Sequence, residues 1–262
     1  MAKTSKNDDP IADSTMSLGD HLEDLRRRLF YALGGLVVGA GLCLIFGPRI
    51  ISFIEGPYVE AMGSEARLQT LAPADGFISY IKIGFISGLI VSSPWVFYHL
   101  WMFVAAGLYA HEKKYVYLAA PFSAILFVCG ALFFMLVVAP LTLGFLIRFN
   151  DKMLGVSSRF TFQHYISFVT HLMLVFGIAF QTPTAIFFLN RTGLVSLGAL
   201  TRSRKYVILL IVIVAAMVTP PDVVSQVTLA VPLYVLFEIG ILLSYLASRK
   251  NRDDSGSPVN SE

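Results

Sequence analysis

The sequence predicts an all-α membrane protein with six transmembrane helices and both termini in the cytoplasm. Of its 262 residues, 56% are hydrophobic and 14% are charged, and the mean hydropathy is +0.70. A soluble domain of this size carries about 25% charged residues, so the apolar excess indicates lipid rather than a large aqueous core. Six apolar runs follow one another along the chain, and most of the lysines and arginines fall on one side of them.

The chain begins with a polar segment, Met1 to Met16, which has little to bury and is predicted to be a disordered cytoplasmic tail. Ser17 then has the character of an N-cap, and leucines at helical spacing follow it, which predicts a short amphipathic helix at the membrane surface over His21 to Leu29. We expect the membrane domain to occupy residues 17–248 and a second disordered cytoplasmic tail to occupy residues 249–262.

The first apolar run, Leu29 to Phe46, is uncharged for 18 residues and just spans a hydrocarbon core of about 30 Å. A cleavable signal peptide would begin similarly, but no clear small-residue cleavage site follows, so the run is expected to be retained. Gly35 and Gly39 form a small-xxx-small pair that would let another helix approach closely. The loop from Pro48 to Gly76 contains an expected interfacial helix over Ile50 to Met62.

The second run, Phe77 to His99, is broken by Lys82 and by Pro94. Lys82 lies close enough to the end of the run for its ammonium group to reach toward the headgroups. A charged and aromatic loop, Leu100 to Lys114, separates this run from the third, Tyr115 to Val138.

A second outer loop is expected over Leu141 to His164, ahead of the fourth run, Tyr165 to Leu189. The fourth run holds Gln181 and Pro183, and a basic loop over Asn190 to Lys205 follows it.

The fifth run, Tyr206 to Val218, has only 13 residues, roughly 20 Å of helix, which is well short of the bilayer. The turn from Thr219 to Asp222 separates it from the sixth run, Val227 to Ala247. A fifth helix this short implies a thinned bilayer or shelter by partner proteins.

The distribution of basic residues predicts the orientation. With six spans, the termini and the loops over residues 100–114 and 190–205 share one side, and that side holds 14 of the 20 lysines and arginines. The positive-inside rule places this side in the cytoplasm.

Motifs for catalysis, metal binding and nucleotide binding are absent from the sequence. It contains no HExxH, no paired CxxC, no GxxxxGK[ST] and no GxSxG, and its histidines lack metal-ligand spacing. Cys43 and Cys129 fall inside apolar runs and are expected to be small buried side chains rather than a disulfide. No enzyme activity, cofactor, metal or nucleic-acid partner is expected.

Acidic residues on the basic, cytoplasmic side are the unusual feature: Asp20, Glu23, Asp24 and Glu112. One interpretation is that they form weak solvated pairs with the neighbouring lysines and arginines. The other is a carboxylate site for the guanidinium groups of a partner, whose fork geometry favours arginine over lysine. The residues alone leave both open.

Three further polar residues lie in or beside the spans. Gln181 and Glu238 fall inside apolar runs, where polar groups usually face protein or water. Glu238 is expected to pair with a hydroxyl or a basic side chain nearby, a structural role slightly favoured over a functional one. Asp222 could simply cap the sixth helix.

Four motifs then indicate a family. HLEDLRRRL, PWVFYHLWMFVAAGLYAHEKK, VTPPDVVSQ and PLYVLFEIG occur in this order around six spans and resemble the TatC family, the multispanning receptor subunits of the twin-arginine protein translocase. The resemblance covers roughly residues 17–248.

The resemblance implies a cupped bundle of six helices in a bacterial cytoplasmic membrane. Such a protein binds signal peptides carrying paired arginines and helps to export folded proteins, driven by the proton gradient. The implied partners are the single-span subunits TatA and TatB, cargo signal peptides, the lipid bilayer and further copies of the chain in a homo-oligomer.

The resemblance also implies site residues. Asp24 and Glu112 would receive the arginine pair, and Arg26 would order the N-terminal segment. The residues that would shape the loop are Phe103, Leu108 and Tyr109. The residues that would lie at partner-binding or intramembrane polar positions are Gln181, Thr219, Pro220, Asp222 and Glu238.

The sequence departs from the family pattern at three places. Asp24 stands where the family usually has glutamate, so the carboxylate is one methylene shorter. Ala105 or Ala106 replaces a proline often found after Phe103, which predicts a less rigid loop. Gln181 stands where some members have glutamate, so this position cannot titrate during transport.

Two other classes of function fit the sequence less well. A secondary transporter would show inverted repeats and broken helices near the bilayer midplane, and no convincing repeat relates spans 1–3 to spans 4–6. A membrane-embedded enzyme would need paired catalytic residues inside the spans, and Gln181 with Glu238 is a poor pair.

Overall fold

The computed structural model describes residues 18–63, 67–108, 113–156, 159–218 and 223–255, which are almost entirely helical. The elements in chain order are α1 (Leu18–Ile45), α2 (Gly47–Met62), α3 (Asp75–Ala106), α4 (Lys113–Phe133), the π-helical turn η1 (Phe134–Val138), α5 (Ala139–Leu154), α6 (Phe162–Ala179), α7 (Thr182–Arg191), α8 (Leu197–Arg202), α9 (Arg204–Val218) and α10 (Val223–Ser255).

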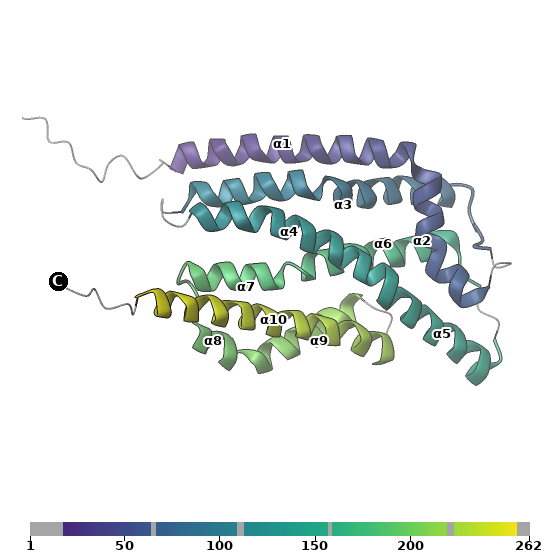
Figure 1. The fold of residues 1–262 in the computed structure, drawn as a ribbon. Helices are drawn as coiled ribbons and strands as arrows, with labels where there is room; N and C mark the ends of the chain where they lie inside the picture. The colour runs from purple at the N-terminus through teal and green to yellow at the C-terminus, as the bar shows by residue number, and fades with distance from the viewer. Residues whose placement is uncertain (1–17, 64–66, 109–112, 157–158, 219–222, 256–262) are drawn as a thin grey trace, which may run out of the picture.

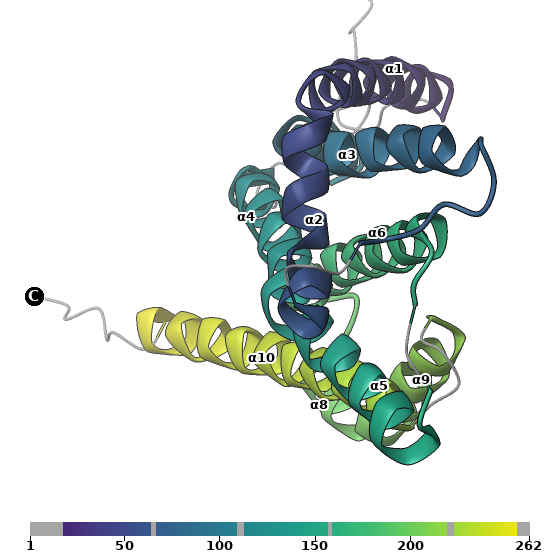
Figure 2. The same cartoon turned by 90° about the vertical axis from the view of Figure 1, so that its right-hand side faces the viewer.

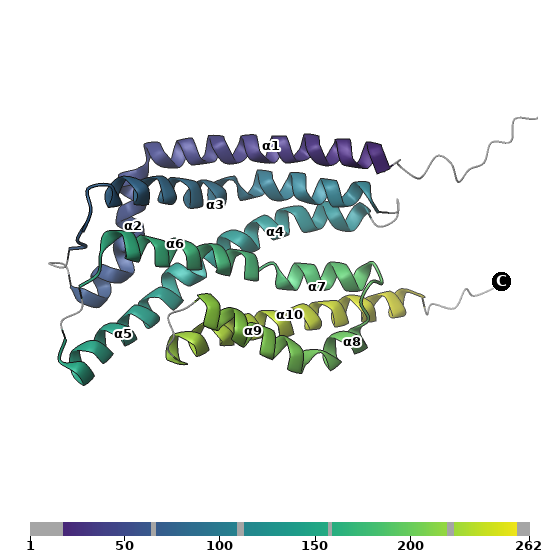
Figure 3. The same ribbon diagram turned by 180° about the vertical axis from the view of Figure 1, so that it is seen from behind.

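The helices form a curved bundle with α1 and α9 at opposite edges (Figure 2). Helix α1 packs chiefly on α3, α3 packs on α4 and α6, α7 packs on α10, and α10 packs on α9. The start of α1 and the end of α10 lie at one end of the bundle, whereas α2 and the end of α5 lie at the other (Figures 1 and 3). We call these the terminal end and the far end.

Five described segments are long and apolar enough to cross a membrane: Glu23–Ile45, Asp75–Ala106, Tyr115–Leu154, Phe162–Arg191 and Gln226–Leu246. The remaining predicted span, the fifth, corresponds to α9, which has 15 residues and is about 22 Å long. Its predicted shortness is therefore confirmed.

Several helices extend beyond the apolar runs that predicted them. The expected surface helix over His21 to Leu29 is not separate, because α1 continues without a break from Leu18. Helix α3 runs through Ala106, so the loop expected to begin at Leu100 starts later. Helix α10 reaches Ser255 and includes the first residues of the expected tail. Helical hydrogen bonds continue past the apolar run because they join backbone groups, whatever the polarity of the side chains.

The expected loop over residues 141–164 is also wrong for its first part, since α4, η1 and α5 form one helical segment that ends at Leu154. Pro140 lies in this segment, and a proline ring clashes with the carbonyl four residues earlier. The π-helical turn just before Pro140 adds one residue to the helical turn. This extra residue makes room for the proline ring, so the helix continues.

The fourth span is interrupted. Helix α6 ends at Ala179 and α7 begins at Thr182, with Gln181 between them. Pro183 has no backbone N–H and occupies the first turn of α7, where that donor is not needed.

The seam between α1 and α3 confirms the small-xxx-small prediction. A Cβ atom on Gly39 would lie 2.8 Å from the carbonyl oxygen of Gly88, and one on Gly88 would lie 2.5 Å from the backbone of Ala40. The two backbones therefore touch. Trp95 Nε1 donates to the carbonyl oxygen of Tyr31, 2.9 Å away, and fixes the register of the two helices.

Several of the largest fully buried side chains lie between α2, η1 and α6, toward the far end. Ile54, Phe134, Tyr165 and Phe176 are fully buried there, and the Tyr165 hydroxyl donates to the carbonyl oxygen of Ile54 at 2.6 Å. At the terminal end, by contrast, α1 presents most of its apolar side chains outward. The acidic motif of α1 thus lies on an edge helix rather than in the core.

Candidate functional site

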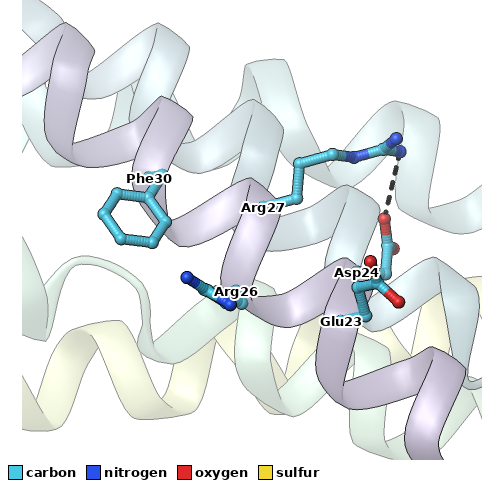
Figure 4. Close-up of a pocket in the computed structure, with 5 residues that line it drawn as sticks. All are labelled: Glu23, Asp24, Arg26, Arg27 and Phe30. Atoms are coloured by element: carbon cyan, nitrogen blue, oxygen red, sulfur yellow. Dashed lines mark hydrogen bonds and ion pairs between the residues drawn. The ribbon is translucent and has the colours of Figure 1, made fainter.

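A surface pocket on the first turns of α1 brings together the charged residues of the HLEDLRRRL motif. Glu23, Asp24, Arg26, Arg27 and Phe30 line it (Figure 4). Residues three and four apart lie on one face of a helix, so this spacing gathers acid, base and one aromatic ring on a single side. The pocket is open to the surroundings at the terminal end.

Asp24 is held by two arginines of its own helix. Arg28 Nε lies 2.6 Å from Asp24 Oδ2, and the Asp24 and Arg28 side chains are only 14% and 20% exposed. The guanidinium of Arg27 lies 3.4 Å from Asp24 Oδ1 and is 68% exposed. Asp24 is therefore not a fully solvated carboxylate, because Arg28 shelters it on one side.

The two oxygens of Asp24 are not equivalent. Oδ2 accepts a short charge-assisted bond, whereas the one contact of Oδ1 with a described side chain is the long contact to the exposed Arg27. An ionised carboxylate offers about four acceptor positions. Glu23 lines the same pocket and makes no hydrogen bond or ion pair with a described residue. The pocket can thus accept additional guanidinium donors at Oδ1 and at Glu23.

Arg28 connects this pocket to a second, apolar one between α1 and α3. The apolar pocket is lined by Leu25, Arg28, Leu29, Ala32, Val96, His99, Leu100 and Phe103. Phe103, predicted as a site residue, therefore lies across the helix pair from the Asp24 motif and is joined to it through Arg28. A peptide with basic and apolar side chains could contact both pockets at once.

His99 was not predicted as a site residue. Its ring lies among three aromatic rings, with centroid distances of 4.7 Å to Trp95, 5.3 Å to Tyr98 and 5.5 Å to Tyr31. Both ring nitrogens are buried without a hydrogen-bond partner among the described residues. The cluster of aromatic residues around position 99 was the signal in the sequence that could have found it.

The other predicted residues of this region have modest roles or lie outside the described residues. The guanidinium of Arg26 lies 5.8 Å from the centroid of the Phe30 ring, a cation–π arrangement. Leu108 is partly buried just after α3, and its N–H donates to the carbonyl oxygen of Ala105 at 3.3 Å. Tyr109 and Glu112 lie outside the described residues.

Two residues beside that loop form a contact that the sequence analysis missed. Arg191, at the end of α7, donates to the Tyr115 hydroxyl at 2.6 Å, and its guanidinium lies 4.7 Å from the centroid of the Tyr115 ring. This contact joins the start of α4 to the end of α7 at the terminal end. A separation of 76 residues left no local signal for it.

Gln181 joins the break between α6 and α7 to α4. Its Nε2 donates to the carbonyl oxygen of Ser123 at 2.9 Å, and Trp101 Nε1 donates to the hydroxyl of the same serine, also at 2.9 Å. Ser123 is fully buried. Gln181 therefore has a structural hydrogen bond inside the chain, and its contact with a partner stays a prediction.

Glu238 makes the intrachain pairing that was expected of it. Its Oε2 lies 2.8 Å from the guanidinium of Arg204 at the start of α9, and the Tyr234 hydroxyl donates to Oε1 at 2.7 Å. This pairing joins the short α9 to α10. Thr219, Pro220 and Asp222 lie outside the described residues.

Comparisons with known proteins agree with this architecture. Residues 20–232 match the family model described as Sec-independent protein translocase protein (TatC). The chain is 35% identical to the TatC protein of Helicobacter pylori J99 over 93% of this chain and 94% of that one, and 36% identical to that of Escherichia coli K12 over 92% and 94%.

Solved structures are similar as well. A crystal structure of the twin arginine translocase receptor TatC in DDM superposes with a TM-score of 0.78 at 34% identity, covering 86% of this chain and 99% of that one. A second crystal structure of this receptor gives 0.77 at 35% identity. The match confirms the predicted fold class, an all-α membrane protein with six transmembrane helices.

Proposed function

Because this chain belongs to the TatC family of Sec-independent protein translocase proteins, we propose that it is a receptor subunit that binds twin-arginine signal peptides. It is a multi-pass membrane protein of the twin-arginine translocase and serves the export of folded proteins across the bacterial cytoplasmic membrane, driven by the proton gradient. It performs no covalent chemistry in this role.

The observation that carries the receptor proposal is the acidic pocket on α1. Asp24 Oδ1 and Glu23 offer acceptor positions within one turn of helix, at an edge of the bundle that a peptide can reach. A pair of adjacent arginines presents two planar forks, and a carboxylate binds such a fork through two parallel hydrogen bonds. Two lysines would carry the same charge without that geometry.

Arg28 limits how an arginine of the signal peptide can bind Asp24. Its guanidinium already occupies Asp24 Oδ2, so an arriving arginine either uses Oδ1 or replaces Arg28. Replacement exchanges one charge-assisted bond for another and therefore has a small net free energy. Glu112, in the segment between α3 and α4, is the other proposed acceptor of an arginine. Tyr109 and Leu108 would shape that segment. The apolar pocket with Phe103 would receive an apolar part of the peptide.

The proposed orientation places the terminal end in the cytoplasm. That end holds the arginines of the α1 motif, Lys113, Arg191, Arg202, Arg204 and Lys205, and the start of α1 and the end of α10 lie there (Figure 1). Under the positive-inside rule this distribution supports a cytoplasmic signal-peptide site.

TatA-type and TatB-type single-span subunits are the proposed partners, with further copies of the chain in a homo-oligomer. The edge helix α9 supports this, because Leu209, Ile213 and Met217 are exposed along it and the helix is too short to span the hydrocarbon alone. Thr219, Pro220, Asp222, Gln181 and Glu238 remain the proposed partner-facing or polar positions.

The test is photo-cross-linking from position 103 to a signal peptide carrying either two arginines or two lysines, in membranes containing the full-length protein. We expect efficient cross-linking to the arginine peptide alone and a loss of about tenfold in Asp24→Asn, since a hydrogen bond to a charged group contributes about 1.5–3 kcal/mol. Glu60→Gln at the far end is the matched carboxylate control and should bind normally.

Glu112→Ala should also weaken binding while leaving the protein inserted. Equal cross-linking of the two peptides, or wild-type binding by both the Asp24 and the Glu112 variants, would refute the proposed receptor site.

A further inference from the structure

Lys82 is a basic residue inside a membrane-spanning segment, and its side chain contacts α6. It lies seven residues after Asp75, the start of α3, which is about 10 Å along the helix. Its Nζ donates to the hydroxyl of Ser167 on α6 at 2.8 Å. The sequence predicts that the ammonium group reaches toward the headgroups, whereas in the structure it bridges α3 and α6.

No described carboxylate forms an ion pair with Lys82, so a neutral hydroxyl is the partner of this charge. An ammonium group in a span is costly unless an anion or water accompanies it. Each of its three protons can be donated, and Ser167 accepts only one of them. The ammonium group therefore has unused donors and no counter-charge among the described residues.

Two histidines extend the donor set along α6. His164, Ser167 and His171 are spaced by three and four residues, which places them on one face of the helix. Both histidines are exposed, and His171 makes no hydrogen bond or ring contact with a described residue. We call Lys82, His164, Ser167 and His171 the outer basic strip.

His164 is already oriented by its neighbour. Its Nδ1 lies 2.5 Å from the Thr161 hydroxyl, and Thr161 forms a β-bridge with Gln69, which lies between α2 and α3. When Thr161 donates to Nδ1, the proton of the neutral imidazole is on Nε2, which becomes a donor. The strip then combines an ammonium group, a hydroxyl and two imidazoles over about 10 Å of helix.

The depth of the outer basic strip in the membrane indicates which ligand it can contact. His164 lies about 3 Å and His171 about 14 Å from Phe162, the first residue of α6. The headgroup layer adds about 5 to 8 Å on each side of the hydrocarbon core, so the strip runs from that layer into the core. Exposed side chains at this depth contact lipid directly.

The short α9 makes a deep phosphate reachable. At about 22 Å it is shorter than a hydrocarbon core of about 30 Å, and a bilayer thins locally beside a short helix. Helices α6 and α9 lie on the same side of the bundle (Figure 2). Thinning on this side lowers the phosphate groups of the adjacent leaflet toward Lys82 and His171.

We propose that the outer basic strip binds the phosphate group of an anionic phospholipid in the leaflet at the far end. The Lys82 ammonium would supply the charge, while Ser167 would orient it, and the histidines would donate to the remaining phosphate oxygens. The site is separate from the Asp24 pocket, which lies at the other end of the bundle.

The experiment measures lipid retained by the purified full-length protein, using native mass spectrometry after equilibration with equal amounts of phosphatidylglycerol and phosphatidylcholine. We expect selective retention of phosphatidylglycerol by the wild-type protein and a loss of about tenfold in Lys82→Gln, as for removal of a charge-assisted hydrogen bond. Lys82→Arg should retain most of the lipid. Lys152→Gln on α5, an exposed basic residue at the same end, is the matched control and should bind as wild type.

His171→Ala is a second test that should not disturb folding, because this exposed side chain has no hydrogen bond or ring contact with a described residue. It should reduce retention about tenfold, as loss of a hydrogen bond to a charged group predicts. Wild-type retention in both Lys82→Gln and His171→Ala would overturn the proposal and leave Lys82 as a tie between helices. Equal retention of the two lipids, or displacement of phosphatidylglycerol by soluble glycerol phosphate, would overturn it as well. Signal-peptide binding is measured on the same variants and should be unchanged.

Discussion

Replacing Gly88 with alanine should separate α1 from α3. The added Cβ would lie 2.5 Å from two backbone atoms of Ala40 and 2.9 Å from the carbonyl carbon of Gly39, whereas ordinary contacts are 3.4–4 Å. Backbone atoms in a helix cannot rotate away, so the helices must move apart by about 1 Å, a gap that forfeits up to half of the dispersion energy of each contact. Overpacking costs about 1–3 kcal/mol, and the better helix propensity of alanine returns up to about 1 kcal/mol.

Alanine substitutions at two other glycines serve as comparisons for Gly88→Ala. A Cβ on Gly84 would meet only the flexible end of the Leu44 side chain, so Gly84→Ala should cost less than Gly88→Ala. A Cβ on Gly34 has no neighbour within 4 Å, so Gly34→Ala should be neutral or stabilising. From most to least stable, the expected order of the variants is therefore Gly34→Ala, Gly84→Ala and Gly88→Ala.

The assay is unfolding in mixed micelles with increasing SDS, followed by the fluorescence of Trp95 in a Trp101→Phe background. Trp95 reports directly on the seam, because its Nε1 bonds to the backbone of α1. We expect a net loss of about 1–2 kcal/mol and altered Trp95 emission in Gly88→Ala. Unchanged stability and emission in that variant would refute the close backbone contact between α1 and α3.

Three further predictions concern single interactions. Gln181→Leu should lower the free energy of unfolding by about 1 kcal/mol, because the Ser123 carbonyl loses its side-chain donor; wild-type stability in that variant would contradict this. Exchanging Arg204 and Glu238 should restore most of the stability lost in either single charge reversal, as a double-mutant cycle would measure, and an additive double variant would speak against the pairing. Burial raises the pKa of the Glu55 carboxyl above its ordinary value of 4.5, so Glu55→Gln should stabilise the protein at neutral pH; the difference should disappear as the pH falls below 4.5, and a pH-independent difference would exclude this cause.

The sign of the Glu55 prediction follows from linkage. A carboxyl whose pKa is higher in the folded state binds more protons when folded, so folding is favoured at low pH and that contribution is lost as the pH rises through the folded-state pKa. The glutamine variant does not titrate and lacks this loss. Denaturation curves for the pair of proteins at several pH values would measure the difference.

Much of the acidic site was predictable from local spacing. Asp24 and Arg28 are four residues apart in a helical pattern, a spacing that favours an ion pair, so their contact was within reach of the sequence. The link from Arg28 to Phe103 was not, because it depends on how α1 rotates against α3. That rotation is decided by the contact between Gly39 and Gly88.

The sequence by itself determined the helical class, the six spans, the short fifth helix and the acidic motif among arginines. These are consequences of composition and of period along the chain, which act over a few turns of helix. Tertiary structure alone decided the partners of the polar groups inside the spans: Ser167 for Lys82, the Ser123 carbonyl for Gln181, and Arg204 for Glu238. These pairs lie 34 to 85 residues apart, and a side chain that must avoid an unpaired charge in lipid takes whichever partner the packing of the helices brings within reach.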